Sequence, residues 1–254
     1  MVRLGQNFLA DPNLLDAIVR DAGLAPADVV LEVGAGEGVL TERLAAVAAR
    51  VHSVEIDRRL EPALAAVAAL PNVSLHWGDA MKVDLRALEP APTAMVANLP
   101  YSVATPLLLR TIELLPSLLT WTVMVQREIA DRLRAGPGSR IYGSPSVVAQ
   151  LACEVELVRK VDAAVFKPRP RVESAILRLR RTGPAADEAT RTLVRAAFAH
   201  RRKSLARSLE HARPGSLAPA RAALVGLGFA ADTRAEALSA EDFAALSAKL
   251  QADG

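Results

Sequence analysis

The stretch Val29–Gly38, with the sequence VVLEVGAGEG, joins a short apolar run to three glycines at alternate positions. An apolar run of this length is typical of a strand that is buried on both faces in a parallel sheet. Glycine allows the backbone to turn sharply and to approach a ligand closely. The stretch therefore predicts a buried strand, a tight turn and the start of a helix, which together form the first unit of an α/β sheet.

The same strand–helix order continues through the next 150 residues. Further strands are expected over residues 51–57, 73–77, 94–97, 120–126, 154–161 and 174–179. Helices are expected from a cap at Asp11, and over residues 39–49, 59–70, 106–115, 127–134 and 146–153. This alternation predicts a doubly wound, mainly parallel sheet.

A second, smaller domain is expected at the C-terminus. Residues 182–187, TGPAAD, combine several turn-forming types and make the best linker in the chain. Beyond them, short helices are indicated over residues 188–200, 203–211, 219–225 and 240–248. We therefore expect an α/β domain over residues 1–181 and a small all-helical domain over residues 182–254.

The composition excludes several classes of protein. With 51% hydrophobic and 23% charged residues, the chain can bury a core and is not disordered. It has no apolar run long enough to span a membrane, and its N-terminus lacks the apolar core of a signal peptide. The single cysteine, Cys153, cannot form an internal disulfide, and no Cys/His spacing indicates a metal site. These features predict a cytoplasmic protein without a metal.

The net charge of +3 is unevenly distributed along the chain. Residues 159–213 contain 15 Lys and Arg against 5 Asp and Glu, a balance of +10, whereas residues 1–158 have a balance of −5. A basic segment beside an acidic one favours a polyanion partner held on one side. An ordinary solvated surface is the alternative interpretation of the charge run alone.

Acidic residues follow the second and third predicted strands. Glu55 lies 17 residues after Gly38, where an acid can bind the hydroxyls of a ribose. Asp79 ends the third strand, where a carboxylate can accept a hydrogen bond from the amine of an adenine. The glycine pattern of the turn, G-x-G-x-G, differs from the G-x-G-x-x-G pattern of dinucleotide-binding sites. The acid Glu32 just before the turn suits a cationic amino-acid ligand better than a pyrophosphate. Together these groups indicate a pocket for S-adenosylmethionine (SAM), with a purely structural turn as the alternative.

The tetrapeptide Asn98–Tyr101, NLPY, follows the fourth predicted strand, beside that pocket. The Asn98 side-chain oxygen and the Leu99 carbonyl can accept from the two N–H groups of an adenine amine, which frees the nitrogen lone pair. Tyr101 can stack on the base. Catalysis of this kind needs positioning and charge complementarity more than a strong general base. A simple strand-end turn is the alternative for this motif alone.

With these motifs in order, the chain resembles the KsgA-like family of rRNA adenine N6,N6-dimethyltransferases. The matching stretches cover nearly all of the chain: residues 5–9, 32–38, 55–57, 78–80, 98–101, 126–133, 137–139, 166–174 and 201–205. The resemblance implies a Rossmann-like SAM-dependent methyltransferase sheet with a small helical C-terminal domain. It also implies that the substrate is two adjacent adenines near the 3′ end of small-subunit rRNA, each methylated twice within a 30S assembly particle. No signal in the sequence indicates an oligomer, so we expect a monomer.

The resemblance also implies roles for individual residues. The residues expected to contact SAM are Asn7, Leu9, Gly34, Glu55, Asp79 and Asn98. The residues expected to hold the flipped base are Asn98, Leu99 and Tyr101, with Phe166 against its other face. The alternative for Phe166, which precedes two prolines, is a core position in a rigid loop. The residues expected to bind RNA phosphates are Lys167, Arg169, Arg171, Arg201, Arg202 and Lys203.

Two alternatives remain at this stage. Ser102 follows the tetrapeptide where the family usually has Asn, and the related Erm enzymes, which methylate large-subunit rRNA, also have Ser there. An Erm-type enzyme is therefore the first alternative. The second is a ribosome-assembly or transcription factor that binds RNA on the same fold without catalysis.

Overall fold

The structure is a computed structural model that describes residues 8–9, 11–168 and 172–252. The chain forms two compact units. The sheet unit contains the chain up to Ala130 and the segment Val155–Arg181, and the helical unit contains Asp131–Glu154 and the chain from Thr182 onward.

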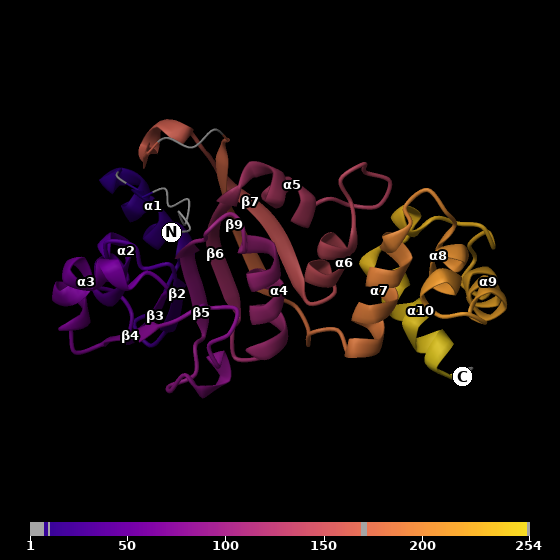
Figure 1. Ribbon diagram of the computed structural model, residues 1–254, viewed down its shortest axis with the longest axis horizontal. Helices are drawn as coiled ribbons and strands as arrows, with labels where there is room; N and C mark the ends of the chain where they lie inside the picture. Colours follow the sequence, from indigo (N-terminus) through magenta and orange to yellow (C-terminus); the bar gives the residue numbers. More distant parts are fainter. Residues whose placement is uncertain (1–7, 10, 169–171, 253–254) are drawn as a thin grey trace. The chain divides into compact units, whose positions relative to one another are not determined.

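The sheet unit is built on a sheet with the strand order β4-β3-β2-β5-β6-β9-β7, which the labels in Figure 1 follow from one edge to the other. The strands are β2 (Val29–Val33), β3 (Arg50–Glu55), β4 (Val73–Trp77), β5 (Ala94–Asn98), β6 (Thr120–Gln126), β7 (Cys153–Val161) and β9 (Ser174–Arg181). The strands from β2 to β6 are parallel, and β9 runs antiparallel to β6. This confirms the doubly wound, mainly parallel sheet.

Helices cover both faces of this sheet. They are α1 (Pro12–Ala22), α2 (Val39–Ala45), α3 (Glu61–Ala68), α4 (Ala104–Leu114) and α5 (Arg127–Leu133). The helix α1 packs against α2, β5 and β6. From β2 the strand order runs through β3 to β4 towards one edge of the sheet, and from β5 to β6 it runs towards the other edge. Because the connections between parallel strands are right-handed, α4 lies on the face of the sheet opposite α2 and α3. The direction reverses between β2 and β5, which is where ligands bind in sheets of this kind.

Local sequence explains how the first helix begins and ends. The Asp11 side chain accepts from the backbone N–H groups of Asn13 (2.8 Å) and Leu14 (3.3 Å), as an N-cap should. The helix ends at Gly23, whose φ of 60° is a left-handed conformation that glycine adopts without strain. The buried face of α1, including Ile18, joins a core that also contains Phe166 and Ile176.

The helical unit consists of α6 (Ser144–Gln150), α7 (Glu188–Ala199), α8 (Leu205–Ala212), α9 (Leu217–Gly226) and α10 (Ala240–Ala252). Figure 1 shows these helices gathered together, and α7 and α10 pack against most of the others. The four helices expected after residue 187 are all present. An additional helix, α6, comes from earlier in the chain.

The chain passes between the two units at three points, after Ala130, after Glu154 and after Arg181, and only the last of these was predicted. The segment Asp131–Glu154, which we expected in the α/β domain, groups with the helical unit. The hydroxyl of Tyr142, fully buried, donates to the Leu238 carbonyl at 2.9 Å, and its ring lies edge-on to Phe198 at 5.8 Å. The Gly138 N–H donates to the Glu236 carbonyl at 2.8 Å. These contacts join residues 56 to 98 positions apart, which no local pattern encodes.

Two details of the fold differ from the expectation. The helix expected over residues 59–70 begins as a short 3-10 helix, Arg58–Leu60, before α3. Separately, β1 (Phe8–Leu9) pairs antiparallel with β8 (Phe166–Lys167), so that Phe166 stands opposite Leu9. Strands of two residues are too short to show an alternating pattern, so the sequence did not indicate this pair.

Within the described residues, no helix has the length and apolarity that crossing a membrane requires. In the same part of the chain, no group of three or more His, Cys, Asp and Glu side chains could hold a metal ion. The side chain of the single cysteine, Cys153, is buried.

Candidate active site

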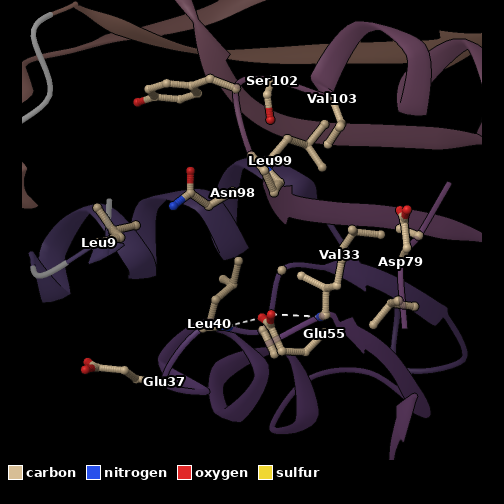
Figure 2. Close-up of a pocket in the computed structure, with 18 of the residues that line it drawn as sticks. Leu9, Val33, Glu37, Leu40, Glu55, Asp79, Asn98, Leu99, Ser102 and Val103 are labelled. Carbon is tan, nitrogen blue, oxygen red and sulfur yellow. Dashed lines mark hydrogen bonds between the residues drawn. The ribbon is translucent and has the colours of Figure 1, made fainter. Parts of the chain in front are cut away.

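A cavity of about 450 Å³ lies at the carboxyl ends of β2, β3, β4 and β5 in the sheet unit. Figure 2 shows that side chains from several of these strand ends, including Glu55, Asp79 and Asn98, surround it. The rest of the wall is largely apolar. The residues that line it are Leu9, Leu15, Val33–Glu37, Val39, Leu40, Val54–Ile56, Gly78–Met81 and Asn98–Val103. The cavity lies at the reversal point of the strand order, as the fold predicts.

The glycine turn after β2 forms one wall of the cavity. Gly34, Gly36 and Gly38 all have positive φ values, of 84°, 58° and 84°. A Cβ at Gly34 would lie 3.6 Å from the Asn98 carbonyl oxygen, and a Cβ at Gly38 would lie 2.9 Å from Val67 Cγ2. The three glycines therefore have a conformational role, and the last also has a steric one.

Glu55 ends β3 and is only 3% exposed. Its Oε2 accepts from the Gly36 N–H at 3.0 Å, and its Oε1 accepts from the N–H groups of Ile56 and Asp57, both at 2.8 Å. Figure 2 marks hydrogen bonds at the Glu55 carboxylate with dashed lines. Backbone donors stabilise an ionised carboxylate. The turn after β2 and the end of β3 thus hold this group in one orientation at the cavity wall.

Glu32 lies beneath the glycine turn and not in the cavity wall. It is 1% exposed, and its Oε2 accepts from Thr41 Oγ1 at 2.6 Å and from Ser53 Oγ at 2.7 Å. The pKa of this carboxyl is raised to about 7, mainly by burial and to a smaller extent by the nearby charge of Glu55, against the lowering effect of the two hydroxyls. Glu32 therefore links β2 to α2 and β3 beneath the glycine turn, and the expectation that it faces a cationic ligand directly is not met.

Asp79 follows β4 and begins the next turn. Its Oδ1 accepts from the Met81 N–H at 2.9 Å, and its backbone carbonyl accepts from Lys82 and Val83. Its Oδ2 lies 3.9 Å from Lys82 Nζ, and the side chain remains 35% exposed. The carboxylate is thus held by the turn and still accessible at the cavity.

The tetrapeptide Asn98–Tyr101 forms the opposite side of the cavity. Leu99 is fully buried, and its N–H donates to the Met124 carbonyl at 3.0 Å. Tyr101 is half-buried, and its hydroxyl lies 2.6 Å from Ser174 Oγ. Burial raises the pKa of the Tyr101 phenol above its usual value, and the hydrogen bond with Ser174 partly offsets this. In Figure 2 Asn98 lies between Leu9 and Leu99. Leu9 belongs to the residues predicted to contact SAM, Leu99 to those predicted to hold the base, and Asn98 to both.

Phe166 is placed differently from its predicted role. It lies in β8 opposite Leu9, is 2% exposed and belongs to the core cluster, and it is not among the residues that line the cavity. Of the other predicted residues in the sheet unit, Lys167 is placed only by its backbone, in β8. Asn7, Arg169 and Arg171 fall outside the described residues.

The remaining predicted RNA-binding residues, Arg201, Arg202 and Lys203, form the turn between α7 and α8 of the helical unit, and all are exposed. Arg201 lies 3.9 Å from a carboxylate oxygen of Glu236. The Lys203 ammonium contacts the ring nitrogen Nε2 of His211. The turn thus presents three adjacent cations to solvent.

Sequence reasoning missed several residues of the site. Ile56, Ala80 and Met81 line the cavity beside Glu55 and Asp79, and their positions next to the strand-end acids could have indicated this. Ser174 could not have been found in the same way, because it meets Tyr101 across 73 residues of sequence.

The chain is similar to known proteins over nearly all of its length. Residues 2–252 match the family described as "Ribosomal RNA adenine dimethylase". A protein of Rubrobacter xylanophilus named "Ribosomal RNA small subunit methyltransferase A" is 48% identical over 248 residues, which cover 96% of this chain and 92% of that protein.

Two solved structures are also similar over nearly the whole chain. A dimethyladenosine transferase from Plasmodium falciparum has a TM-score of 0.79 at 26% identity, covering 94% of this chain and 95% of that one. The 23S rRNA methyltransferase ErmE has a TM-score of 0.71 at 30% identity, covering 96% of this chain and all of that one. The Rossmann-like methyltransferase sheet with its helical region is thereby confirmed. Because the family match runs from residue 2 through both units to residue 252, the chain belongs to the ribosomal RNA adenine dimethylases.

Proposed function

We propose that this protein uses SAM to dimethylate N6 of two adjacent adenines near the 3′ end of small-subunit rRNA, on a 30S particle late in assembly. The observation that carries the proposal is the meeting of Glu55, Asp79 and Asn98 around one cavity, from the carboxyl ends of the parallel strands β3, β4 and β5. The relative from Rubrobacter xylanophilus, at 48% identity, supports the choice of small-subunit rRNA.

The residues of the cavity fit the parts of SAM. Oε2 of Glu55 accepts one backbone hydrogen bond and has a second lone pair for a ribose hydroxyl. The Asp79 carboxylate can accept from the adenine amine, with Ile56 and Met81 as apolar walls for the ring. Gly34 and Leu9 leave room for the methionine part close to Asn98. When bound, SAM supplies a methyl group made electrophilic by its sulfonium.

The tetrapeptide then prepares the target amine. The Asn98 side-chain oxygen and the Leu99 carbonyl accept from the two N–H groups, so the nitrogen becomes pyramidal and its lone pair is free to form the new N–C bond. The methylated ammonium is acidic and loses its proton to water, so no general base is needed. The rate enhancement comes from positioning and from acceptors oriented before the reaction begins.

RNA is held by both units in this proposal. Tyr101 stacks on the flipped adenine, and the cations of the turn Arg201–Lys203 bind phosphates of the RNA backbone. Lys167, Arg169 and Arg171 act beside the base. Phe166 stacks on its other face, which requires the ring to leave the buried position that it has in the structure. The protein acts as a monomer in the cytoplasm.

The deciding experiment measures which rRNA accepts the methyl group. The protein is incubated with methyl-labelled SAM and either unmethylated 30S particles or protein-free large-subunit rRNA. We expect N6,N6-dimethyladenine in the small-subunit rRNA, at two adjacent positions near the 3′ end. The similarity to ErmE and the presence of Ser102 at the cavity favour an Erm-type activity as the second candidate. Label in the large-subunit rRNA alone would establish that candidate instead.

A further inference from the structure

We infer that Ser174 is a positioning residue for methyl transfer, because its hydroxyl holds the ring of Tyr101 in the orientation that stacks on the target base. The inference rests on the stacking role of Tyr101 proposed above. Ser174 does not line the cavity and touches neither the proposed cofactor nor the base, so it acts through Tyr101.

The geometry of this pair is specific. Tyr101 Oη and Ser174 Oγ lie 2.6 Å apart, which is a short hydrogen bond between two hydroxyls. Ser174 is fully buried and is the first residue of β9, where it stands opposite Gln126 of β6. The bond therefore joins the turn after β5 to a strand two positions away in the sheet.

The first residues of β9 are themselves firmly held. The Arg127 N–H donates to the Glu173 carbonyl at 3.0 Å, and the Arg127 guanidinium donates to the Glu173 carboxylate, also at 3.0 Å. The next residues along β9, Ala175 and Ile176, are fully buried. Ser174 thus offers a fixed anchor, whereas Tyr101 lies in a turn and is half exposed.

Burial also determines the direction of the hydrogen bond. The Ser174 hydroxyl has no other hydrogen-bond partner among the described residues, and a buried donor is rarely left unsatisfied. Its proton is therefore donated to Tyr101 Oη. The phenolic proton of Tyr101 remains free to be donated to water or RNA, because that side chain is only half-buried.

This bond matters because a free tyrosine ring must be ordered when the base binds. Ordering a side chain opposes binding through lost conformational entropy. With the ring already fixed in the free enzyme, that loss does not occur when RNA binds. Removing the anchor should therefore weaken RNA binding and leave the chemical step nearly unchanged.

The test is a double-mutant cycle on methyl transfer with Ser174→Ala, Tyr101→Phe and both together. Each single variant should raise KM for RNA about three- to tenfold, the effect of one hydrogen bond, with kcat changed by less than about twofold. The double variant should be no worse than either single variant. Ser174→Thr, which keeps the hydroxyl, should restore KM. Thr122→Val, at a residue equally buried on β6, is the matched control for general loosening of the sheet.

A spectroscopic readout separates positioning from folding. The chain has two tyrosines, so ring-labelled protein gives two sets of NMR signals, and Tyr142 in the helical unit serves as the internal reference. In Ser174→Ala the pKa of Tyr101 should rise, because the donor that stabilises its phenolate is removed, and that of Tyr142 should not change.

The outcomes distinguish this inference from the proposed function. If Tyr101→Ala abolishes activity while Ser174→Ala and Tyr101→Phe leave KM unchanged, or if their effects add, the positioning role is wrong and the stacking role stands. If Tyr101→Ala itself keeps full methyl transfer, the stacking role fails and the positioning role fails with it.

Discussion

Single residues of the glycine turn have little freedom to change. At Gly38, a side chain would adopt a φ of 84° and meet Val67 Cγ2 at 2.9 Å. We expect Gly38→Ala to lower the free energy of unfolding of the sheet unit by about 2 kcal/mol, from the strained backbone and the close approach together. Both tryptophans, Trp77 and Trp121, lie in that unit, so urea unfolding followed by tryptophan fluorescence measures it.

A comparison variant is Gly136→Ala, which lies in the helical unit, so its urea unfolding is followed by far-UV circular dichroism. A Cβ at Gly136 meets nothing within 4 Å, and its φ is not in the positive range. Its unfolding midpoint should remain that of the wild type. Equal losses in the two variants would contradict the steric argument for Gly38.

Asn98 is the residue on which the proposed chemistry depends most. Asn98→Ala removes a side-chain acceptor that is oriented before the reaction, and loss of one such group typically costs about 100- to 1,000-fold in kcat. We expect a loss of this size in single-turnover methyl transfer, with the protein still folded. Asn13→Ala, at an exposed position of α1, is the control and should be fully active. Full activity in Asn98→Ala would exclude the base-holding mechanism.

Glu32 makes stability depend on pH. Its pKa is about 7 in the folded protein against an ordinary value of 4.5, so the folded state binds more protons between these values. The free energy of unfolding should therefore fall by about 2–3 kcal/mol as pH rises from 5 to 8. Glu32→Gln should remove this fall, as measured by urea unfolding at both pH values.

The control for this titration is Glu42→Gln, at an exposed position of α2. His52 and His76 act in the opposite direction, because burial lowers the pKa of both side chains, and their effect is common to all variants. A pH dependence that is unchanged in Glu32→Gln would mean that Glu32 does not titrate as inferred.

At the scale of elements, the end of α4 depends on a residue of a distant strand. Arg181, the last residue of β9, donates from Nη2 to the carbonyls of Ile112 (3.0 Å) and Leu115 (3.1 Å), and from Nε to that of Leu118 (2.7 Å). The guanidinium also lies 5.1 Å from the ring centroid of Trp121. Part of the basic run therefore caps a helix and is not available to RNA.

We expect Arg181→Ala to lower the free energy of unfolding of the sheet unit by about 2 kcal/mol, through carbonyls left without a charged donor. Arg181→Lys should recover little of it, since an ammonium cannot reproduce the fork of donors. Arg180→Ala, at the exposed neighbouring position, should be close to neutral in the same urea unfolding experiment. If Arg180→Ala is as destabilising as Arg181→Ala, the cap is not the cause.

The elements also show where sequence patterns are sufficient. The strands Val29–Val33, Val73–Trp77 and Thr120–Gln126 have the predicted bounds, because continuous apolar runs between turn residues have few other structures available. The helix α2 ends at Ala45 and not at residue 49, since alanine favours a helix without determining its end. Trp77, at the end of β4, is only half-buried, and the Arg58 guanidinium lies 5.4 Å from its ring centroid.

At the scale of the whole molecule, the basic segment 159–213 is divided between the two units. Several of its cations have carboxylate partners: Arg159 with Asp21, Arg178 with Glu156, and Arg191 and Arg195 with Glu188. These pairs reduce the charge available to RNA. The exposed turn between α7 and α8 is the part that we expect to bind phosphates.

We therefore expect Arg202→Ala with Lys203→Ala to weaken rRNA binding and to reduce its salt dependence, by about one unit of slope for each phosphate that the variant no longer neutralises. Binding measured between low and high salt checks this. Arg221→Ala with Arg234→Ala removes the same charge from the helical unit at residues that have carboxylates nearby, and it should change the slope less. Equal slopes for the two double variants would exclude a specific role for the turn.

The sequence alone determined the order of strands and helices, the glycine turn and the acids at the strand ends, because these follow from spacing within a few residues. Parallel strands bring their carboxyl ends to one edge, so the sequence pattern was sufficient to place Glu55, Asp79 and Asn98 together. The tertiary structure decided what depends on distant contacts: Ser174 beside Tyr101, the segment Asp131–Glu154 in the helical unit, and Phe166 in the core. These contacts join residues far apart in the sequence, Leu9 and Phe166 by 157 positions, and the burial that selects them exists only in the folded chain.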